Sequence, residues 1–202
     1  MADTQQSLIL ASASELRRKL LENAGLKYVC DPAAIDEHEI KESLLMERAS
    51  STRVAETLAE LKAQRVAVRH PGCLVIGADQ VLDCDGILYD KPTNIAAARS
   101  DLLALRGKIH TLVTCVVIVR DGNRLWHHSD KSVLTMRAFS DSFLESYLEQ
   151  VAGGVCASVG AYQLEARGVQ LFEKIDGDHF SILGLPLLPL IEFLRSHGIA
   201  SR

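Results

Sequence analysis

The sequence predicts a mixed α/β fold, in which helices flank a sheet that contains both parallel and antiparallel strands. Two short, continuous apolar runs at residues 7–11 and 73–78 are typical of strands covered on both faces. Helical patterns alternate with strands in the first half of the chain, as in α/β proteins. Later, two long strand patterns surround Asp121-Gly122, which is the turn signal of an antiparallel hairpin.

The elements of the first half follow from the apolar spacing and from stop signals. A strand at residues 7–11 turns through residues 12–14 into a helix at 14–24, which Gly25 ends. A strand at residues 28–30 precedes an acidic, polar stretch at 36–42, to which we assign no helix or strand. A long helix from Ser50 or Ser51 to about Arg69 ends at Pro71-Gly72 and leads into the strand at 73–78.

The second half begins with residues 81–82 and 87–89, which flank the hairpin signal Asp85-Gly86. The remaining elements follow from the same signals, in the order helix 94–105, strand 110–119, strand 125–136, helix 139–151, strand 169–175 and helix 186–196. Gly153-Gly154 is interpreted as a loop and not as a domain boundary.

Length and composition are those of one globular domain spanning residues 1–202. Hydrophobic residues make up 48% of the chain and charged residues 24%, a balance that disfavours long disordered regions. The net charge of -4 argues against a large nucleic-acid-binding surface, so phosphate chemistry would need a local basic pocket. No apolar stretch is long enough for a membrane span, and residues 1–7 lack the features of a secretion signal. We therefore expect a cytoplasmic protein without membrane or nucleic-acid partners.

Several common site motifs are absent. The five cysteines include no C-x-x-C pair, so we expect free thiols in a reducing cytosol and no zinc site. The chain has no G-x-x-x-x-G-K-[ST] phosphate loop, no G-x-G-x-x-G fingerprint and no G-x-S-x-G nucleophile elbow.

The first candidate site is the turn that leads from the first strand into the first helix. Ser12 and Ser14 stand in this turn, and Arg17 and Arg18 follow within the first helical turn, where Ser14 lies beside both arginines. Free N–H groups and the positive end of a helix form a ready anion site, and guanidinium groups suit phosphate oxygens. The alternative is a capped surface helix with solvated arginines. Cations are mildly unfavourable at a helix start, which favours a functional reason for them.

The second candidate is Asp79, at the carboxyl end of the buried strand, where α/β sheets place their ligands. Its carboxylate could hold a magnesium ion or take a proton from water, and it could equally cap a turn. Glu37, Lys62 and Lys91 are further charged residues, which the local pattern alone does not separate from ordinary solvated charges.

Taken together, these segments resemble the Maf family of nucleotide pyrophosphatases over nearly the whole chain. The pieces occur in family order, and they are Leu10-Ala11-Ser12 with Arg17-Arg18, Ile35-Asp36-Glu37, Leu58-Ala59 with Lys62-Ala63, Ile76-Gly77-Ala78-Asp79-Gln80-Val81, Lys91-Pro92, Leu105-Arg106-Gly107 with His110, Gly160-Ala161-Tyr162, Ile175-Asp176-Gly177-Asp178 and Gly184-Leu185-Pro186-Leu187. Each piece is weak by itself, and the ordered set is specific.

The resemblance implies an elongated mixed sheet flanked by helices, with two lobes and a central cleft, similar to inosine-triphosphate pyrophosphatases. It implies hydrolysis of a nucleoside triphosphate between the α and β phosphates, with Mg²⁺ or Mn²⁺ as cofactor and a homodimer as the assembly. Asp79 matches the family's proposed proton acceptor. The matching polar residues are Ser12, Arg17, Arg18, Glu37, Lys62 and Lys91. Glu37 and Asp79 are the expected metal ligands, and which of them is the base stays open.

Three positions resemble the branch of the family that acts on 7-methyl-GTP. They are the extra residue Leu16 before the arginine pair, Gln80 after Asp79, and the late Glu165. A late glutamate could accept hydrogen bonds from the guanine edge and suits a cationic methylated base. The alternatives are the dTTP/UTP branch, and a nucleotide-binding regulator of septum formation with little catalysis.

Overall fold

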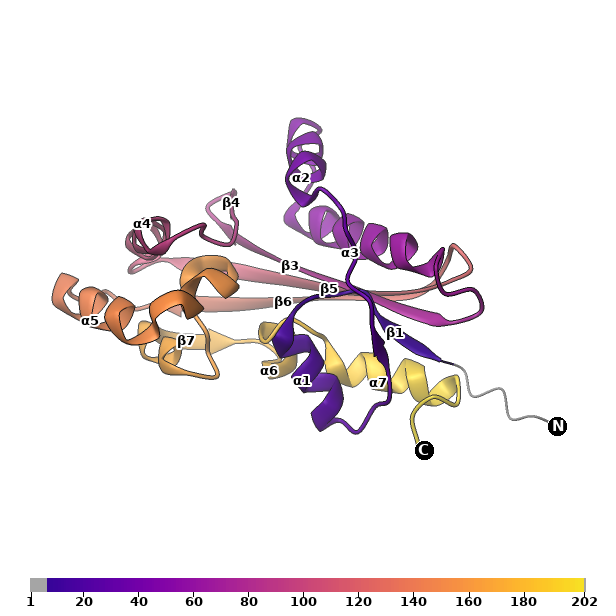
Figure 1. Cartoon of the computed structure of the whole chain (residues 1–202). Coiled ribbons are helices and arrows are strands. Elements are labelled where there is room, and N and C mark those ends of the chain that lie inside the picture. Colours follow the sequence, from indigo (N-terminus) through magenta and orange to yellow (C-terminus); the bar gives the residue numbers. More distant parts are fainter. Residues whose placement is uncertain (1–6, 202) are drawn as a thin grey trace. The chain divides into compact units, whose positions relative to one another are not determined.

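The computed structural model describes residues 7–201, and it leaves the side chains of residues 152 and 153 undescribed. Residues 1–6, where the sequence predicts no secretion signal, lie outside the described residues. The strands form one seven-stranded sheet in the order β2-β1-β3-β5-β6-β7, with β4 paired to β3 (Figure 1). Their bounds are β1 (Leu8–Leu10), β2 (Val29–Cys30), β3 (Leu74–Cys84), β4 (Ile87–Tyr89), β5 (Ile109–Arg120), β6 (Asn123–Met136) and β7 (Phe172–Asp176).

The pairing directions confirm the predicted mixed sheet. β1 runs parallel to both β2 and β3, with Leu10 opposite Cys30 on one side and opposite Ile76 on the other. β4 and β7 pair antiparallel with β3 and β6, respectively. β5 and β6 are neighbours joined at the predicted Asp121-Gly122 turn, where both residues have positive φ (51° and 77°).

The helices are α1 (Glu15–Asn23), α2 (Glu37–Met46), α3 (Ser51–Ala67), α4 (Ile95–Leu105), α5 (Asp141–Val151), α6 (His179–Ile182) and α7 (Leu187–Ser196), with 3₁₀ turns η1 (Ala152–Ala157), η2 (Val159–Ala161) and η3 (Arg167–Leu171). Most begin at a side-chain cap, which explains where they start. Ser14, Asp36, Ser50 and Asn94 each accept a hydrogen bond from the backbone N–H three residues ahead.

The chain divides into two compact units. The first contains the chain up to Asp79, residues 114–130 and the chain from Asp178 onward; the second contains residues 80–113 and 131–177. The boundaries fall within β3 and β5 and between residues 130 and 131 of β6.

In the first unit, helices cover both faces of the sheet. Leu10, Ile76 and Ala78 join a buried core with residues of α1 and α7 on one face (Figure 1). Successive strand residues point to opposite faces, so Gly77 and Asp79 point the other way, toward α3. A Cβ at residue 77 would collide with the carbonyl oxygen of Ala59 and lie 2.8 Å from the Cβ of Ala63. Small residues thus bring α3 close to β3 at the point where Asp79 follows.

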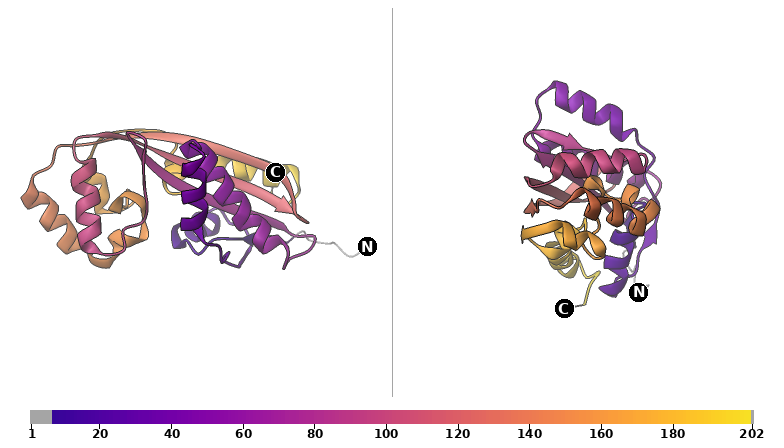
Figure 2. Two further views of the ribbon diagram at one scale, coloured as in Figure 1. Left: turned by 90° about the horizontal axis from the view of Figure 1, so that it is seen from above. Right: turned by 90° about the vertical axis from the view of Figure 1, so that its left-hand side faces the viewer.

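In the second unit, α4 packs against α5 and against the turns η1 and η2 (Figure 2). His110 is buried there, and its Nε2 lies 2.8 Å from the hydroxyl of Tyr162. Burial lowers the pKa of His110 from its ordinary 6.5 to about 4. The Tyr147 hydroxyl donates to the carbonyl of Ala161, a residue held at φ +60°.

Several predicted elements need correction. The polar stretch at 36–42 begins a helix, α2, which has no buried residue and therefore little of the apolar periodicity that predicts helices. Residues 74–78 and 81–82 belong to one strand, β3, which continues past Asp79. The last strand starts at Phe172, because Val169 lies in η3. The four-residue helix α6 was not predicted, and Gly153-Gly154 lies in η1.

Among the described residues, none of the helices has both the length and the apolar character that a bilayer crossing needs.

Candidate active site

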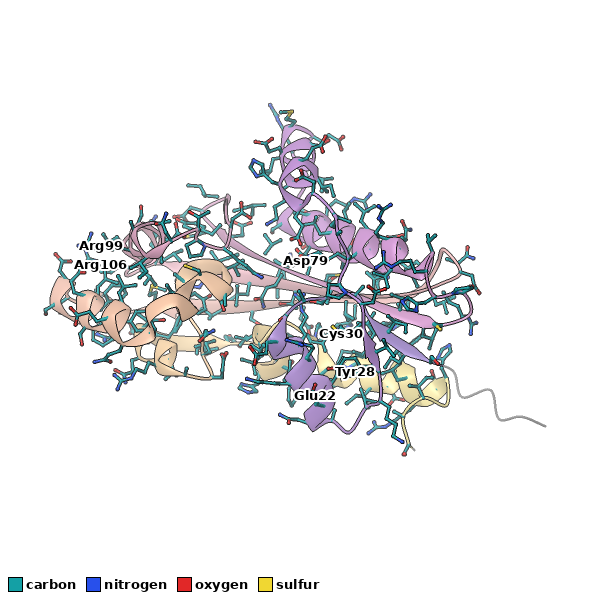
Figure 3. All side chains as sticks on the ribbon, in the orientation of Figure 1. Glu22, Tyr28, Cys30, Asp79, Arg99 and Arg106 are labelled. Carbon is teal, nitrogen blue, oxygen red and sulfur yellow. The ribbon has the colours of Figure 1, made fainter. Side chains whose placement is uncertain are left out.

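The centre of the candidate site is a buried lysine held between two carboxylates. Lys62 Nζ lies 2.6 Å from Asp79 Oδ1 and 2.9 Å from Glu37 Oε1. The side chains of Lys62 and Asp79 are only 10% and 7% exposed, whereas that of Glu37 is 47% exposed. The ion pair is therefore shielded on the Asp79 side and open to solvent on the Glu37 side. Figure 3 labels Asp79 where the strands pass beneath α3.

Secondary structure explains why these three residues meet. Asp79 shares the face of β3 that Gly77 presents to α3. Lys62 lies three residues after Ala59 on α3 and so projects from the same side of that helix. Glu37 is the first residue of α2, whose start Asp36 caps and which packs against α3. The structure thus joins three predicted residues that the local sequence pattern did not single out as a group.

One oxygen of the cluster has no hydrogen-bond partner among residues 7–201. Asp79 Oδ2 is buried and makes no hydrogen bond to these residues, although the other carboxylate oxygen, Oδ1, is bound to Lys62. An unsatisfied buried acceptor on an acidic side chain is costly, and such groups call for an explanation. A divalent cation would satisfy it.

The donor set fits magnesium or manganese better than zinc. Within residues 7–201, no group of three or more His, Cys, Asp or Glu side chains is placed to hold a metal. Mg²⁺ is commonly held by one or two carboxylates, and waters and substrate phosphates fill its other positions. Asp79 and Glu37 match that pattern.

The predicted anion site forms at the β1–α1 turn. Ser14 caps α1, and its Oγ accepts from the backbone N–H of Arg17 at 3.3 Å. Ser12 is buried, and its Oγ accepts from the N–H of Ser14 at 3.2 Å and from Arg17 Nη1 at 3.1 Å. The hydroxyls of both serines therefore shape the turn itself.

The two arginines of this turn have different surroundings. Arg17 is buried, and burial lowers its pKa while the negative charges of Asp79 and Glu37 act in the opposite direction. Arg18 is partly exposed, its Nε has no partner, and its guanidinium makes no hydrogen bond or ion pair with residues 7–201. Leu16, which directly precedes the two arginines in α1, is half-buried and packs against the apolar core.

The remaining predicted residues, Gln80, Lys91 and Glu165, belong to the second unit. Gln80 is half-buried on β3 directly after Asp79, Lys91 is exposed after β4, and Glu165 is exposed between η2 and η3. Their roles in the site stay predictions.

Two acceptors near the site were missed by sequence reasoning. The main-chain oxygens of Ala78 and Gly184 accept hydrogen bonds from Arg17 at 2.8 and 2.7 Å. Both residues lie within motifs that carry the family resemblance. No side-chain pattern indicates a main-chain acceptor, so only the fold could reveal them.

The fold and the cluster define a mixed α/β protein with a buried Lys–Asp pair beside a helix start that suits phosphate. The chain belongs to the Maf family, because the family model described as "Maf-like protein" matches residues 7–197.

Similar proteins agree with this family. A protein of Paramagnetospirillum magneticum named nucleoside triphosphate pyrophosphatase is 56% identical, over 94% of this chain and 98% of its own. One of Granulibacter bethesdensis with the same name is 51% identical, over 94% and 96%. A Rhizobium etli protein named 7-methyl-GTP pyrophosphatase is 48% identical, over 95% and 96%.

Proposed function

We propose that this protein hydrolyses nucleoside triphosphates between the α and β phosphates, releasing a nucleoside monophosphate and pyrophosphate. The observation that carries the proposal is the buried Lys62–Asp79 pair, in which one carboxylate oxygen has no partner in the part of the chain that the structure describes. The names of the Paramagnetospirillum and Granulibacter relatives support the same activity.

Asp79 and Glu37 would hold a divalent metal ion. When bound, such an ion neutralises phosphate charge and lowers the pKa of a bound water. Lys62 lies between the two carboxylates, so it keeps them together despite their like charge. It also adds positive potential beside the phosphates.

The protein residues have distinct tasks in the reaction. Arg18 and the N-terminal N–H groups of α1 bind phosphate oxygens and oppose the charge that develops during transfer. The Asp79 carboxylate accepts a proton from water as the water oxygen bonds to the α phosphorus. The bond from that phosphorus to the α–β bridging oxygen breaks, and its electron pair leaves with pyrophosphate. The proton then passes from Asp79 to solvent.

The finer proposal is that 7-methyl-GTP is a preferred substrate. Its support is the late glutamate Glu165, with Gln80 and Leu16 at the positions that resemble this branch. The Rhizobium relative, which carries that name at 48% identity, also supports it. A dTTP or UTP preference is the competing outcome.

The test is a panel of 7-methyl-GTP, GTP, dTTP, UTP and CTP with Mg²⁺ or Mn²⁺, with pyrophosphate and monophosphate both quantified. In ¹⁸O-labelled water, attack at the α phosphorus puts the label in the monophosphate and none in pyrophosphate. Label in pyrophosphate, or release of single phosphates, would contradict the proposed bond cleavage. No release from any triphosphate would favour the septum-formation regulator.

The assembly and location are proposals of the same kind. We propose a cytoplasmic homodimer from the family resemblance. Light scattering of the purified protein at micromolar concentration gives the mass, and a monomer at all concentrations would contradict the dimer.

A further inference from the structure

Arg17 bridges three separate segments of the first unit. Its Nε donates to the carbonyl of Gly184 at 2.7 Å, in the turn between α6 and α7. Its Nη1 donates to the carbonyl of Ala78 on β3 at 2.8 Å and to Ser12 Oγ after β1 at 3.1 Å. These acceptors meet only in the folded protein, since Gly184 and Arg17 are 167 residues apart.

The hydrogen bond from Arg17 to Ala78 extends the row of backbone hydrogen bonds between β1 and β3, with a side chain as the donor. The N–H of Ala11 donates to the carbonyl of Ile76 at 2.8 Å, just past the end of β1. The next β3 carbonyl on that side is Ala78, because carbonyls alternate in direction along a strand. The chain has by then left β1 and turned toward α1, and the Arg17 guanidinium donates to this carbonyl instead. This anchors the peptide that carries Asp79.

The same contacts leave Arg17 poorly suited to bind phosphate. Bidentate recognition needs two adjacent free N–H groups on one edge of the guanidinium. The N–H of Nε is directed to Gly184, and the N–H groups of Nη1 are directed to Ala78 and Ser12. On each edge of the Arg17 guanidinium, at least one N–H group therefore already donates a hydrogen bond within the protein. Arg18 contrasts with this, because its guanidinium has no hydrogen bond to the described residues.

Gly184 is adapted to this contact. Its φ of +102° lies in the region that favours glycine, so a side chain there would strain the backbone. The turn thus directs its carbonyl at the guanidinium with a backbone that other residues adopt only with strain.

We propose that Arg17 is a positioning residue, which aligns Asp79 through the Ala78 peptide and ties the α6–α7 turn to it, and is not a phosphate ligand. The proposal rests on the proposed function for its kinetic consequences. Its structural consequence, that Arg17 holds the Ala78–Asp79 peptide, does not depend on that function.

The kinetic test compares Arg17→Ala with Arg18→Ala as the matched neighbour. For Arg17→Ala we expect kcat to fall about 10²-fold with KM within about threefold of wild type, because a misplaced catalytic group costs about that much. Millimolar guanidinium should restore part of the kcat of Arg17→Ala. For Arg18→Ala we expect KM to rise, and the binding of inorganic tripolyphosphate, measured by calorimetry, to weaken. If Arg17→Ala instead weakens tripolyphosphate binding as much as Arg18→Ala does, with kcat unchanged, the positioning role is wrong.

Amide hydrogen exchange tests the same idea without turnover. Arg17→Ala should accelerate exchange in the peptides that contain Ala78–Asp79 and Gly184, whereas Arg18→Ala should leave both at wild-type rates. If the alanine variant does not fold, Arg17→Lys replaces it in this measurement, because lysine keeps the charge but lacks the planar guanidinium group. Unchanged exchange in a folded Arg17 variant would overturn the proposal. Faster exchange in a protein that hydrolyses no triphosphate would uphold the positioning role and reject the enzymatic function.

Discussion

Asp79 and Asp31, both in the first unit, are each held by cations, and they differ in exposure and in how fully their oxygens are bound. Asp79 is buried and shares Lys62 with Glu37, and its Oδ2 has no partner among the described residues. Asp31 is partly exposed, and both of its oxygens are bound, by Arg69 at 2.8 and 3.0 Å and by His70 at 2.7 Å.

The difference in bound oxygens distinguishes the candidate site around Asp79 from the surface ion-pair cluster around Asp31. The Asp31 cluster ties the residues after β2 to the residues after α3, and it is complete without a further ligand. The Asp79 cluster is incomplete, because burying a carboxylate oxygen without a hydrogen bond or a bound cation costs free energy. The unpartnered oxygen on a buried charged side chain is therefore the feature that makes the Asp79 cluster the candidate site.

The largest expected effect that tests this comparison is that of Asp79→Asn. It keeps the shape of the side chain but removes the acceptor for the water proton, so kcat should fall about 10³-fold, within the range for general-base catalysis. Pyrophosphate release at saturating substrate measures it. Asp31→Asn is the matched control and should turn over as wild type. If Asp79→Asn also retains wild-type turnover, the catalytic role is wrong.

Lys62→Gln should have the largest effect on stability. Removing one partner of a buried ion pair leaves Asp79 uncompensated, which costs about 3 kcal/mol. The counterpart Arg69→Gln lies on the surface and should lower the free energy of unfolding much less. Urea unfolding of both variants gives the comparison. Equal losses would mean that burial does not distinguish the two clusters.

Metal dependence gives a third, smaller effect. EDTA should abolish turnover, and Mg²⁺ or Mn²⁺ should restore it. Glu37→Gln weakens one of two proposed ligands, so we expect about tenfold more Mg²⁺ for half-maximal activity, equivalent to ~1.4 kcal/mol. Glu39→Gln, two residues along α2, is the control. An unchanged metal requirement in Glu37→Gln would exclude Glu37 as a ligand.

The smallest effect concerns acid stability. The hydrogen bonds from Arg69 and His70 lower the pKa of Asp31 from its ordinary 3.8 to about 2. The group therefore stabilises the folded state above pH about 4, and this contribution is lost as pH falls from about 4 to about 2. His110 acts in a higher window, because its lowered pKa makes stability fall between pH about 6.5 and about 4. Urea unfolding of wild type and Asp31→Asn at pH 5 and pH 3 isolates the Asp31 contribution. Parallel losses in the two proteins would contradict it.

Sequence reasoning succeeded where periodicity was strong. The buried runs of β1 and β3, the long helix α3 and the Asp121-Gly122 turn were all predicted close to their observed positions. It failed for α2, whose residues have no buried face, and for the continuity of β3 past Asp79. Both features depend on contacts with other elements of the fold. The helix α2 packs against α3, and the end of β3 pairs with β4.

The family, the mixed sheet and the set of candidate residues could all be predicted from the sequence, because ordered motifs and apolar periodicity are properties of the chain. The sequence left Asp79 equally a turn cap or a functional carboxylate, and it treated Arg17 and Arg18 alike. Tertiary structure decided both matters. The alternation of β3 directs Asp79 at Lys62 on α3, and the end of the β1 ladder directs Arg17 at the Ala78 carbonyl. Hydrogen-bond partners from distant segments exist only after packing. They distinguish Arg17, whose donors are bound, from Arg18, whose guanidinium has no hydrogen bond to the described residues.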